Sequence, residues 1–305
     1  MRGSGFVALL FVTFLCSCDQ LSATMQGVSV LTKAPDLATA GGMDPALTDV
    51  LPFDDMPSQK ATLIAVGLAE KESPTSTAAP TPVTGAQVFL AWETSEVKAC
   101  EKSDSTGTYA ATSLPLGPCA STSLAYVQDV KYVTRIETGT DVYTINTTPP
   151  PPVDASKVTF SPALDTSSSL SSLVVPHHEL GLDLTIDWSA DAAANENHAF
   201  VVLARMNFEG NQANPADVLN DTKWKADDAN PVFDNTPREP GEMLALILNE
   251  PVSHATIPGP EALDVAGMYV LVLTSAKVSQ DVSSNLALGS GGLAGAGVAF
   301  LFWVD

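Results

Sequence analysis

Positively charged residues are scarce in this chain. It has 14 lysines and arginines against 35 aspartates and glutamates, for a formal net charge of -21 over 305 residues. Nucleic-acid binding depends on Lys and Arg side chains that neutralise phosphates, so this balance argues against a nucleic-acid partner. It also argues against electrostatic attachment to a membrane surface, which needs the same side chains.

Long apolar runs and helical periodicity are missing as well. The N-terminal run "FVALLFVTFL", at 6–15, has about half of the ~20 residues that a membrane-spanning helix needs. It follows Arg2 and precedes small residues, which is the pattern of a signal-peptide core. Elsewhere Val, Thr, Ser, Gly and Pro dominate, and short apolar runs are bounded by turn residues. This pattern predicts an all-β protein.

Two cysteines stand directly behind this apolar run, in "FLCSCDQ" at 14–20. Leu15, Cys16, Ser17 and Cys18 resemble the lipobox of bacterial lipoproteins, in which an aliphatic and two small residues precede a cysteine. The resemblance implies that residues 1–17 are cleaved as a signal peptide and that the Cys18 sulfur carries a diacylglycerol thioether. Only a thiolate is a strong enough nucleophile for this near neutral pH. We therefore expect a chain outside the cytoplasm, lipid-anchored to a bacterial membrane, the outer rather than the inner.

The cysteine count is consistent with this interpretation. The alternatives are incidental cysteines in an ordinary secretory signal, or a metal or redox pair, for which no second ligand pair follows. If Cys16 leaves with the signal and Cys18 carries lipid, Cys100 and Cys119 remain of the four cysteines. In an oxidising compartment these two are expected to form a disulfide.

Changes in composition divide the mature chain. Residues 18–58 lack sustained periodicity and are expected to form a lipidated flexible tether. The prolines of "TTPPPPVDAS" predict an extended linker at 149–156. This linker separates two predicted β-sandwich domains, at 59–148 and 157–305.

The first domain contains "VTGAQVFL" followed by "SDSTGTYAATSLPLGP". Gly107 suits a turn position with positive φ, and Tyr109 combines a large apolar ring with a polar tip. The two stretches resemble the carboxypeptidase regulatory-like (transthyretin-like) β-sandwich, which implies a non-catalytic module with Tyr109 beginning a buried strand. The matching positions are Gly85, Ala86, Val88, Asp104, Gly107, Tyr109, Leu114, Pro115 and Gly117.

The second domain begins with "LDLTIDW", at 182–188, in which Leu182, Leu184, Ile186 and Trp188 are expected on one buried face. Further strands are expected in "AFVVLARM", "EMLALILNE", "GMYVLVLTSAK" and "GVAFLFWV", with "GSGGLAGAG" as a flexible hairpin before the last. Trp188 and "LDVAGMYVLVLTSA" resemble fibronectin-III or immunoglobulin-like sandwiches. The resemblance implies that Tyr269 is the buried tyrosine of a late strand.

A long polar insertion, at 207–241, interrupts the second domain. Long loops on a rigid scaffold often carry binding. Trp224 and Phe233 are the candidate ligand-binding residues, because their rings could stack on a sugar. Burial of these rings as loop anchors is the competing interpretation.

No catalytic, cofactor or metal pattern is complete. His177 and His178 are adjacent, so in a strand they point to opposite faces and are not expected to share a metal ion. The acid pairs 54–55 and 227–228 could attract Ca²⁺ but lack EF-hand spacing. The nucleophile elbow G-x-S-x-G is missing. We expect no cofactor, no metal site and no enzymatic activity.

These observations predict a membrane-anchored envelope lipoprotein with a structural, adhesion or protein-binding role. Its expected partners are membrane lipid, through the anchor, and an envelope protein or a glycan. The alternative is a carbohydrate- or metal-ion-binding lipoprotein that uses the insertion at 207–241. An enzyme is the third option.

Overall fold

A computed structural model describes residues 25–33, 35, 62–70, 79–102, 106–113, 119–167, 169–170, 173–195, 197–205, 243–248, 252–287 and 289–305. These residues are mostly in β-strands, as expected. Their helical parts are two four-residue helices and one 3₁₀ turn, α2 (Ala192–Asn195), α4 (Gly259–Ala262) and η4 (Ala155–Lys157).

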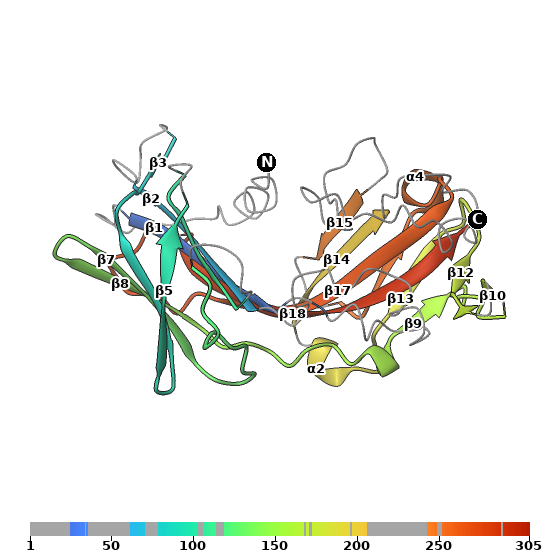
Figure 1. Ribbon diagram of the computed structural model, residues 1–305, viewed down its shortest axis with the longest axis horizontal. Coiled ribbons are helices and arrows are strands. Elements are labelled where there is room, and N and C mark those ends of the chain that lie inside the picture. Colours follow the sequence, from blue (N-terminus) through green and yellow to red (C-terminus); the bar gives the residue numbers. More distant parts are fainter. Residues whose placement is uncertain are drawn as a thin grey trace.

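Most strands belong to one large, curled mixed sheet (Figure 1). In spatial order its strands are β15 (Met243–Leu248), β14 (His198–Arg205), β17 (Gly267–Ser279), β18 (Gly291–Val304), β1 (Met25–Lys33), β2 (Thr62–Glu70), β6 (Thr108–Thr112), β5 (Ser95–Glu101), β4 (Gln87–Trp92), β7 (Tyr132–Thr138) and β8 (Asp141–Thr147). Two short strands, β3 (Thr81–Pro82) and β12 (His177–His178), pair with β2 and β18.

Two smaller sheets complete the described fold. One has three strands in the order β16 (His254–Ile257), β13 (Leu184–Asp187) and β9 (Thr159–Ser161). The other pairs β10 (Ser169–Leu170) with β11 (Leu173–Val174).

Strand β18 connects the two halves of the molecule, as Figure 1 shows. β17 pairs with it in antiparallel fashion along its whole length. Its first residues pair in parallel with β1, and its last two pair with β12. On one face of β18, Ala294 enters a first hydrophobic core, while Phe300 and Phe302 enter a second. Since alternate residues of a strand share a face, both cores lie on the same side of this sheet.

The first core lies between two layers of the curled sheet. β1, β2 and β6 form one layer and β5, β4, β7 and β8 the other. β5 connects the layers, because it pairs with β4 along its length and with β6 at its end. β8 then returns to the loop after β17, where the Asn146 amide donates to the Asp281 carbonyl at 2.8 Å. The Ser283 amide donates to the Thr144 carbonyl at 2.9 Å, which closes the layer.

The second core lies between the large sheet and the three-stranded sheet. Strands β14, β17 and β18 supply one side, and β16, β13 and β9 the other. Aromatic rings fill the space between them: Phe160 meets Phe300 edge-on at 5.1 Å, and Tyr269 stacks on Phe302 at 6.0 Å between ring centroids. Trp188 is also fully buried here.

The structure differs from the sequence-based expectation at residues 25–33, which were assigned to the flexible tether. They form β1, between β2 and β18 in the large sheet. Its buried face includes Gly27 and Ser29, so the strand shows little apolar alternation. Gly27 leaves room for Leu68 and Ile145, since an added Cβ would lie 3.3 Å from each. The Ser29 hydroxyl hydrogen-bonds the Thr134 hydroxyl at 2.7 Å inside the core.

The halves are also connected by more than the proline linker. They share β17 and β18, whereas two separate sandwiches were expected. Pro149 and Pro150 are buried, and their carbonyls accept hydrogen bonds from the Asp129 amide and the Tyr126 hydroxyl. Val153 enters the second core. The segment 149–153 therefore contacts both halves, through Pro149 and Pro150 at its start and Val153 at its end.

Candidate functional site

The predicted lipid attachment site and ligand-binding residues lie outside the described residues. These are Cys18, Trp224 and Phe233, together with the insertion 207–241 and the acid pairs 54–55 and 227–228. The structure therefore bears on them only through the neighbouring segments.

The described chain begins at Met25, seven positions after Cys18. At about 3.6 Å per residue, Cys18 can lie at most ~25 Å from Met25. The Met25 side chain is buried, and its carbonyl accepts a hydrogen bond from the Ala287 amide at 2.6 Å. Any force on Cys18 would thus reach a strand that is paired on both sides.

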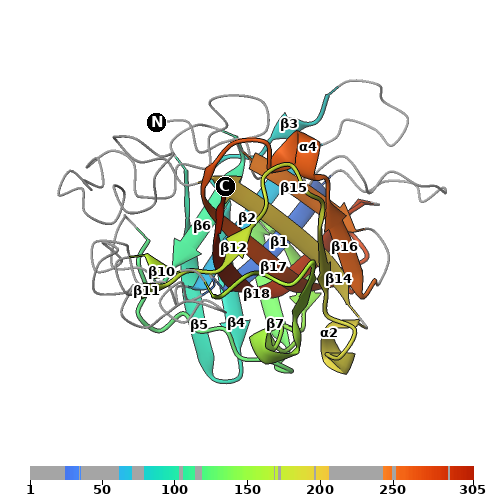
Figure 2. The same cartoon turned by 90° about the vertical axis from the view of Figure 1, so that its right-hand side faces the viewer.

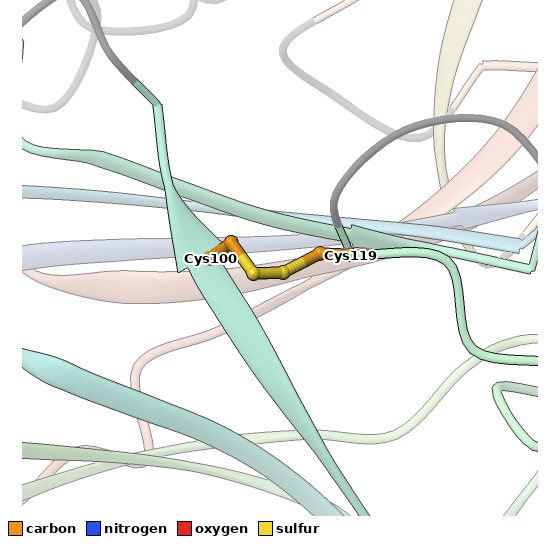
Figure 3. Close-up of a disulfide and its surroundings, with 2 residues drawn as sticks. All are labelled: Cys100 and Cys119. Atoms are coloured by element: carbon orange, nitrogen blue, oxygen red, sulfur yellow. A yellow bond between two sulfur atoms is a disulfide. The ribbon is translucent and has the colours of Figure 1, made fainter.

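The expected disulfide between Cys100 and Cys119 is confirmed (Figure 3). The Cα atoms of the two cysteines are 5.7 Å apart, and the cysteines are separated by 19 positions in the sequence. Cys100 lies where β5 crosses to β6, and the Cys119 carbonyl accepts a hydrogen bond from the Thr112 amide of β6 at 3.2 Å. The disulfide therefore fastens the segment after β6 to the crossing between the two layers.

Gly107 and Tyr109 occupy the positions expected from the sequence. Gly107 has φ of +68°, and an added Cβ would clash with the Leu68 carbonyl. Tyr109 is buried in the first core, and its hydroxyl donates to the Val83 carbonyl and accepts from the Ala86 amide, both at 3.0 Å. Burial raises the pKa of this phenol. Its role here is to hold β6 against the segment before β4.

His177 and His178 meet different surroundings, as adjacent strand residues should. The His178 ring is buried, packs edge-on against Phe302, and lies 2.8 Å through Nε2 from the Leu182 carbonyl. His177 lies with Nδ1 3.4 Å from Asp305 Oδ1. Its backbone pairs with Asp165, whose pKa is lowered chiefly by the hydrogen bonds from Ser167 and less by His177.

The described residues contain neither a cluster of metal-ligating side chains nor a membrane-spanning helix. In these ranges, no three or more His, Cys, Asp or Glu side chains gather closely enough to hold a metal ion. Within the same ranges, no helix has the length and apolar character needed to cross a membrane.

Exposed apolar side chains mark a surface that the sequence did not predict. Leu180, Leu182 and Val265 are 45%, 42% and 43% exposed, at the end of β18 where the chain finishes. We call these three side chains the distal patch. Leu182 was expected to face the core, but β13 begins only at Leu184. Before it, Gly181 has φ of +72° and turns the chain, which rotates Leu182 outward.

The loops that carry the distal patch are held together by hydrogen bonds. The Gly181 amide donates to the Leu263 carbonyl at 2.8 Å, and the Leu180 amide donates to the Asp305 carbonyl at 3.0 Å. The Asp183 carboxylate accepts from the Gly259 amide of α4 at 2.8 Å. Figure 2 looks onto this end of the molecule and shows α4 beside the C-terminus. No single residue signals such a patch, because it forms only when segments some eighty positions apart meet.

Comparison with known proteins adds no family assignment: no family model matches the chain, and no curated protein matches it.

Proposed function

We propose that this chain is a bacterial envelope lipoprotein, anchored through Cys18 outside the cytoplasm, with a structural or protein-binding role. The observation that carries the proposal is "LCSC" at 15–18, directly behind a signal-like apolar run. Diacylation stabilises membrane attachment by ~0.8 kcal/mol for each buried CH₂ group. The short connection from Cys18 to β1 supports the same role, because it ties the anchor to an interior strand of the sheet.

The proposal treats the two halves as β-sandwich-like modules, one around each core, that share β18. The first is of carboxypeptidase regulatory-like type, which the turn at Gly107 and the buried Tyr109 support. The second is immunoglobulin- or fibronectin-III-like, which Tyr269 supports: it is buried in a late strand, and its hydroxyl donates to the Val265 carbonyl at 2.8 Å.

A non-catalytic role is supported by what the buried polar side chains do. Asp191 is 3% exposed and accepts hydrogen bonds from the Asp154 amide at 2.8 Å and the Ala194 amide at 3.3 Å. The buried His178 and the exposed Asp183 likewise form hydrogen bonds with loop backbone. Each of these groups satisfies a backbone atom of a turn, which is a structural use.

Lipidation is tested with the full chain expressed in a Gram-negative host supplied with labelled palmitate. The wild type and the matched control Cys16→Ser should incorporate label and fractionate with membranes. Cys18→Ser should lose the label, because only the Cys18 thiol accepts the diacylglycerol. Labelling of Cys18→Ser equal to that of the wild type would contradict the anchor assignment.

The protein-binding role is tested by chemical crosslinking of intact cells, followed by purification of the lipidated chain and mass spectrometry. A reproducible envelope protein at the crosslinked position supports it. Confirmed lipidation with no crosslinked protein in repeated experiments would count against it.

A further inference from the structure

Large apolar side chains are rarely exposed in the described residues. Five of them are: Leu63, Val142, Leu180, Leu182 and Val265. Three of the five form the distal patch, on loops that hydrogen bonds join directly. Single exposed apolar residues need no explanation, but a gathering of them on one surface marks an interaction site.

The distal patch is preorganised. Each of its residues has backbone bonded to a neighbouring element: Leu180 to Asp305, Leu182 to His178, and Val265 to the Tyr269 hydroxyl. Gly259 leaves no room for a side chain, because an added Cβ would clash with the Leu182 carbonyl. Since the loops are already ordered, binding would cost little further conformational entropy.

Exposed acidic residues lie on the same segments as the distal patch, and we call them the acidic rim. The exposed acids on its two loops, on α4 and at the last residue are Glu179, Asp183, Glu261, Asp264 and Asp305. The segments 175–183, 258–266 and 303–305 contain no lysine or arginine. An apolar centre with an acidic rim is complementary to a partner whose apolar residues are flanked by Lys and Arg.

This charge pattern selects among possible occupants. A second copy bound through the same patch would bring acidic rim against acidic rim, and the whole chain carries a net charge of -21. An anionic membrane surface would be repelled by the same carboxylates. A basic amphipathic segment of another protein would be attracted by these carboxylates rather than repelled.

The position of the patch fits a partner beyond the anchored membrane. β1 and β18 run in parallel, with Val28 opposite Gly291, and β18 continues to Val304. At about 3.3 Å per residue the run from Gly291 to Val304 covers about 43 Å. The distal patch therefore lies at the end of β18 that is farther from Met25, the first described residue after Cys18.

We propose that Leu180, Leu182 and Val265, with their acidic rim, form a docking site for a basic amphipathic segment of a partner protein. The inference rests on the proposed protein-binding role and names the surface and chemistry that would serve it.

The test uses the purified full chain and a fluorescent synthetic helix of leucine and lysine, measured by fluorescence anisotropy. Leu182→Ser should weaken binding at least tenfold, because it removes an apolar contact. The matched control Val142→Ser, which is 50% exposed on β8, should bind like the wild type. Equal affinities of Leu182→Ser and Val142→Ser would overturn the proposal.

A charge variant tests the rim separately. Glu261→Lys with Asp264→Lys should weaken binding of the leucine–lysine helix at least tenfold, whereas Asp141→Lys, at the other end of the molecule, should leave it within twofold. Thermal unfolding of each variant shows that the fold is retained. A rim variant that binds as the wild type does would count against the proposal.

Other occupants give distinct results. Binding to anionic phospholipid vesicles that Leu182→Ser abolishes, with helix binding unchanged, would overturn the proposal in favour of a membrane. A dimer of the wild type that Leu182→Ser dissociates would overturn it in favour of self-association. Repeating the helix titration with Cys18→Ser separates the two proposals, because loss of the anchor leaves the docking surface intact.

Discussion

The two cores of this protein are enclosed in different ways. The first lies within one curled stretch of sheet, closed by hydrogen bonds from β8 to the loop after β17 and fastened by the disulfide Cys100–Cys119. The second lies between three long strands of the large sheet and three short strands from distant parts of the chain.

Large aromatic side chains are buried in both cores: Trp92, Tyr109, Tyr132 and Tyr143 in the first, and Trp188, Tyr269, Phe300 and Phe302 in the second. The first core tolerates small and polar residues such as Gly27 and Ser29, because neighbouring strands hold the layers together. The three-stranded sheet of the second core has strands of only three or four residues. Large aromatic side chains there bury more area for each ordered residue, and so offset the weak strand pairing. Both cores thus depend on aromatic burial, and the first has the disulfide and the closure by β8 in addition.

The largest effect is expected from Trp188→Ala in the second core. Trp188 is 1% exposed, and replacing a buried Trp by Ala costs about 3–5 kcal/mol. Hydrogen exchange should accelerate in β13, β16 and β14, while β4 and β7 keep their protection. Uniform acceleration in both halves would show that the two cores unfold as one unit, which would contradict this prediction.

Removal of the disulfide by Cys100→Ala and Cys119→Ala should affect the first core instead. For a separation of 19 residues the chain-entropy account gives a loss of ~3 kcal/mol in the free energy of unfolding. Urea unfolding with and without reductant measures it: reductant should lower the midpoint of the wild type and leave the double variant unchanged. An unchanged midpoint in the double variant would mean that backbone closure alone holds this core.

Alanine variants of two glycines can distinguish the cost of backbone strain in a turn from the cost of a steric clash in the first half of the molecule. Gly107 and Gly139 both have positive φ, at +68° and +59°. Alanine at either position costs about 1–2 kcal/mol in backbone strain. At Gly107 its Cβ also clashes with the Leu68 carbonyl, whereas at Gly139 nothing lies within 4 Å. Gly107→Ala should therefore be less stable than Gly139→Ala by a further ~1–3 kcal/mol in urea unfolding. Equal losses would mean that the loop relaxes around the new methyl group.

The smallest effect is expected for the pH dependence of stability at Asp281, in the loop after β17 that is bonded to β8. A hydrogen bond from the Asn146 side chain holds the pKa of this carboxyl below its usual range, and Lys131 at 3.4 Å assists. Its contribution is thus present above the unfolded-state pKa near 3.8 and is lost as pH falls through the lower folded-state pKa. From about pH 5 to about pH 3, the urea midpoint should fall more in the wild type than in Asp281→Asn. Asp264→Asn, which removes an acid at the other end, is the control; parallel profiles for wild type and Asp281→Asn would contradict the assignment.

The sequence predicted part of this structure for local reasons. The alternation in "LTIDW" and the continuous apolar run in "GMYVLVLT" are local patterns, so β13 and β17 were expected where they occur. The turn at Gly107 needs only a residue that adopts positive φ. The disulfide followed from the cysteine count together with the expectation of an oxidising compartment.

The missed features depend on distant neighbours. Residues 289–296 were expected to form a flexible hairpin, but β18 already begins at Gly291. A side chain at Gly292 would clash with Thr147, so the glycine there serves close approach of β8 rather than flexibility. β1 was missed because Gly27 and Ser29 interrupt its apolar face. Leu182 was misplaced because the turn at Gly181 rotates it out of the strand.

By itself, then, the sequence determined the β class, several strand positions and the cysteine pair, since each depends on neighbouring residues or on composition. Only the tertiary structure decided that β18 is shared between two cores, that β1 is an interior strand, and that hydrogen bonds join the segments on which the exposed Leu180, Leu182 and Val265 lie. These features arise from contacts between segments far apart in the chain, and no local pattern of residues encodes which distant strand a given strand will meet.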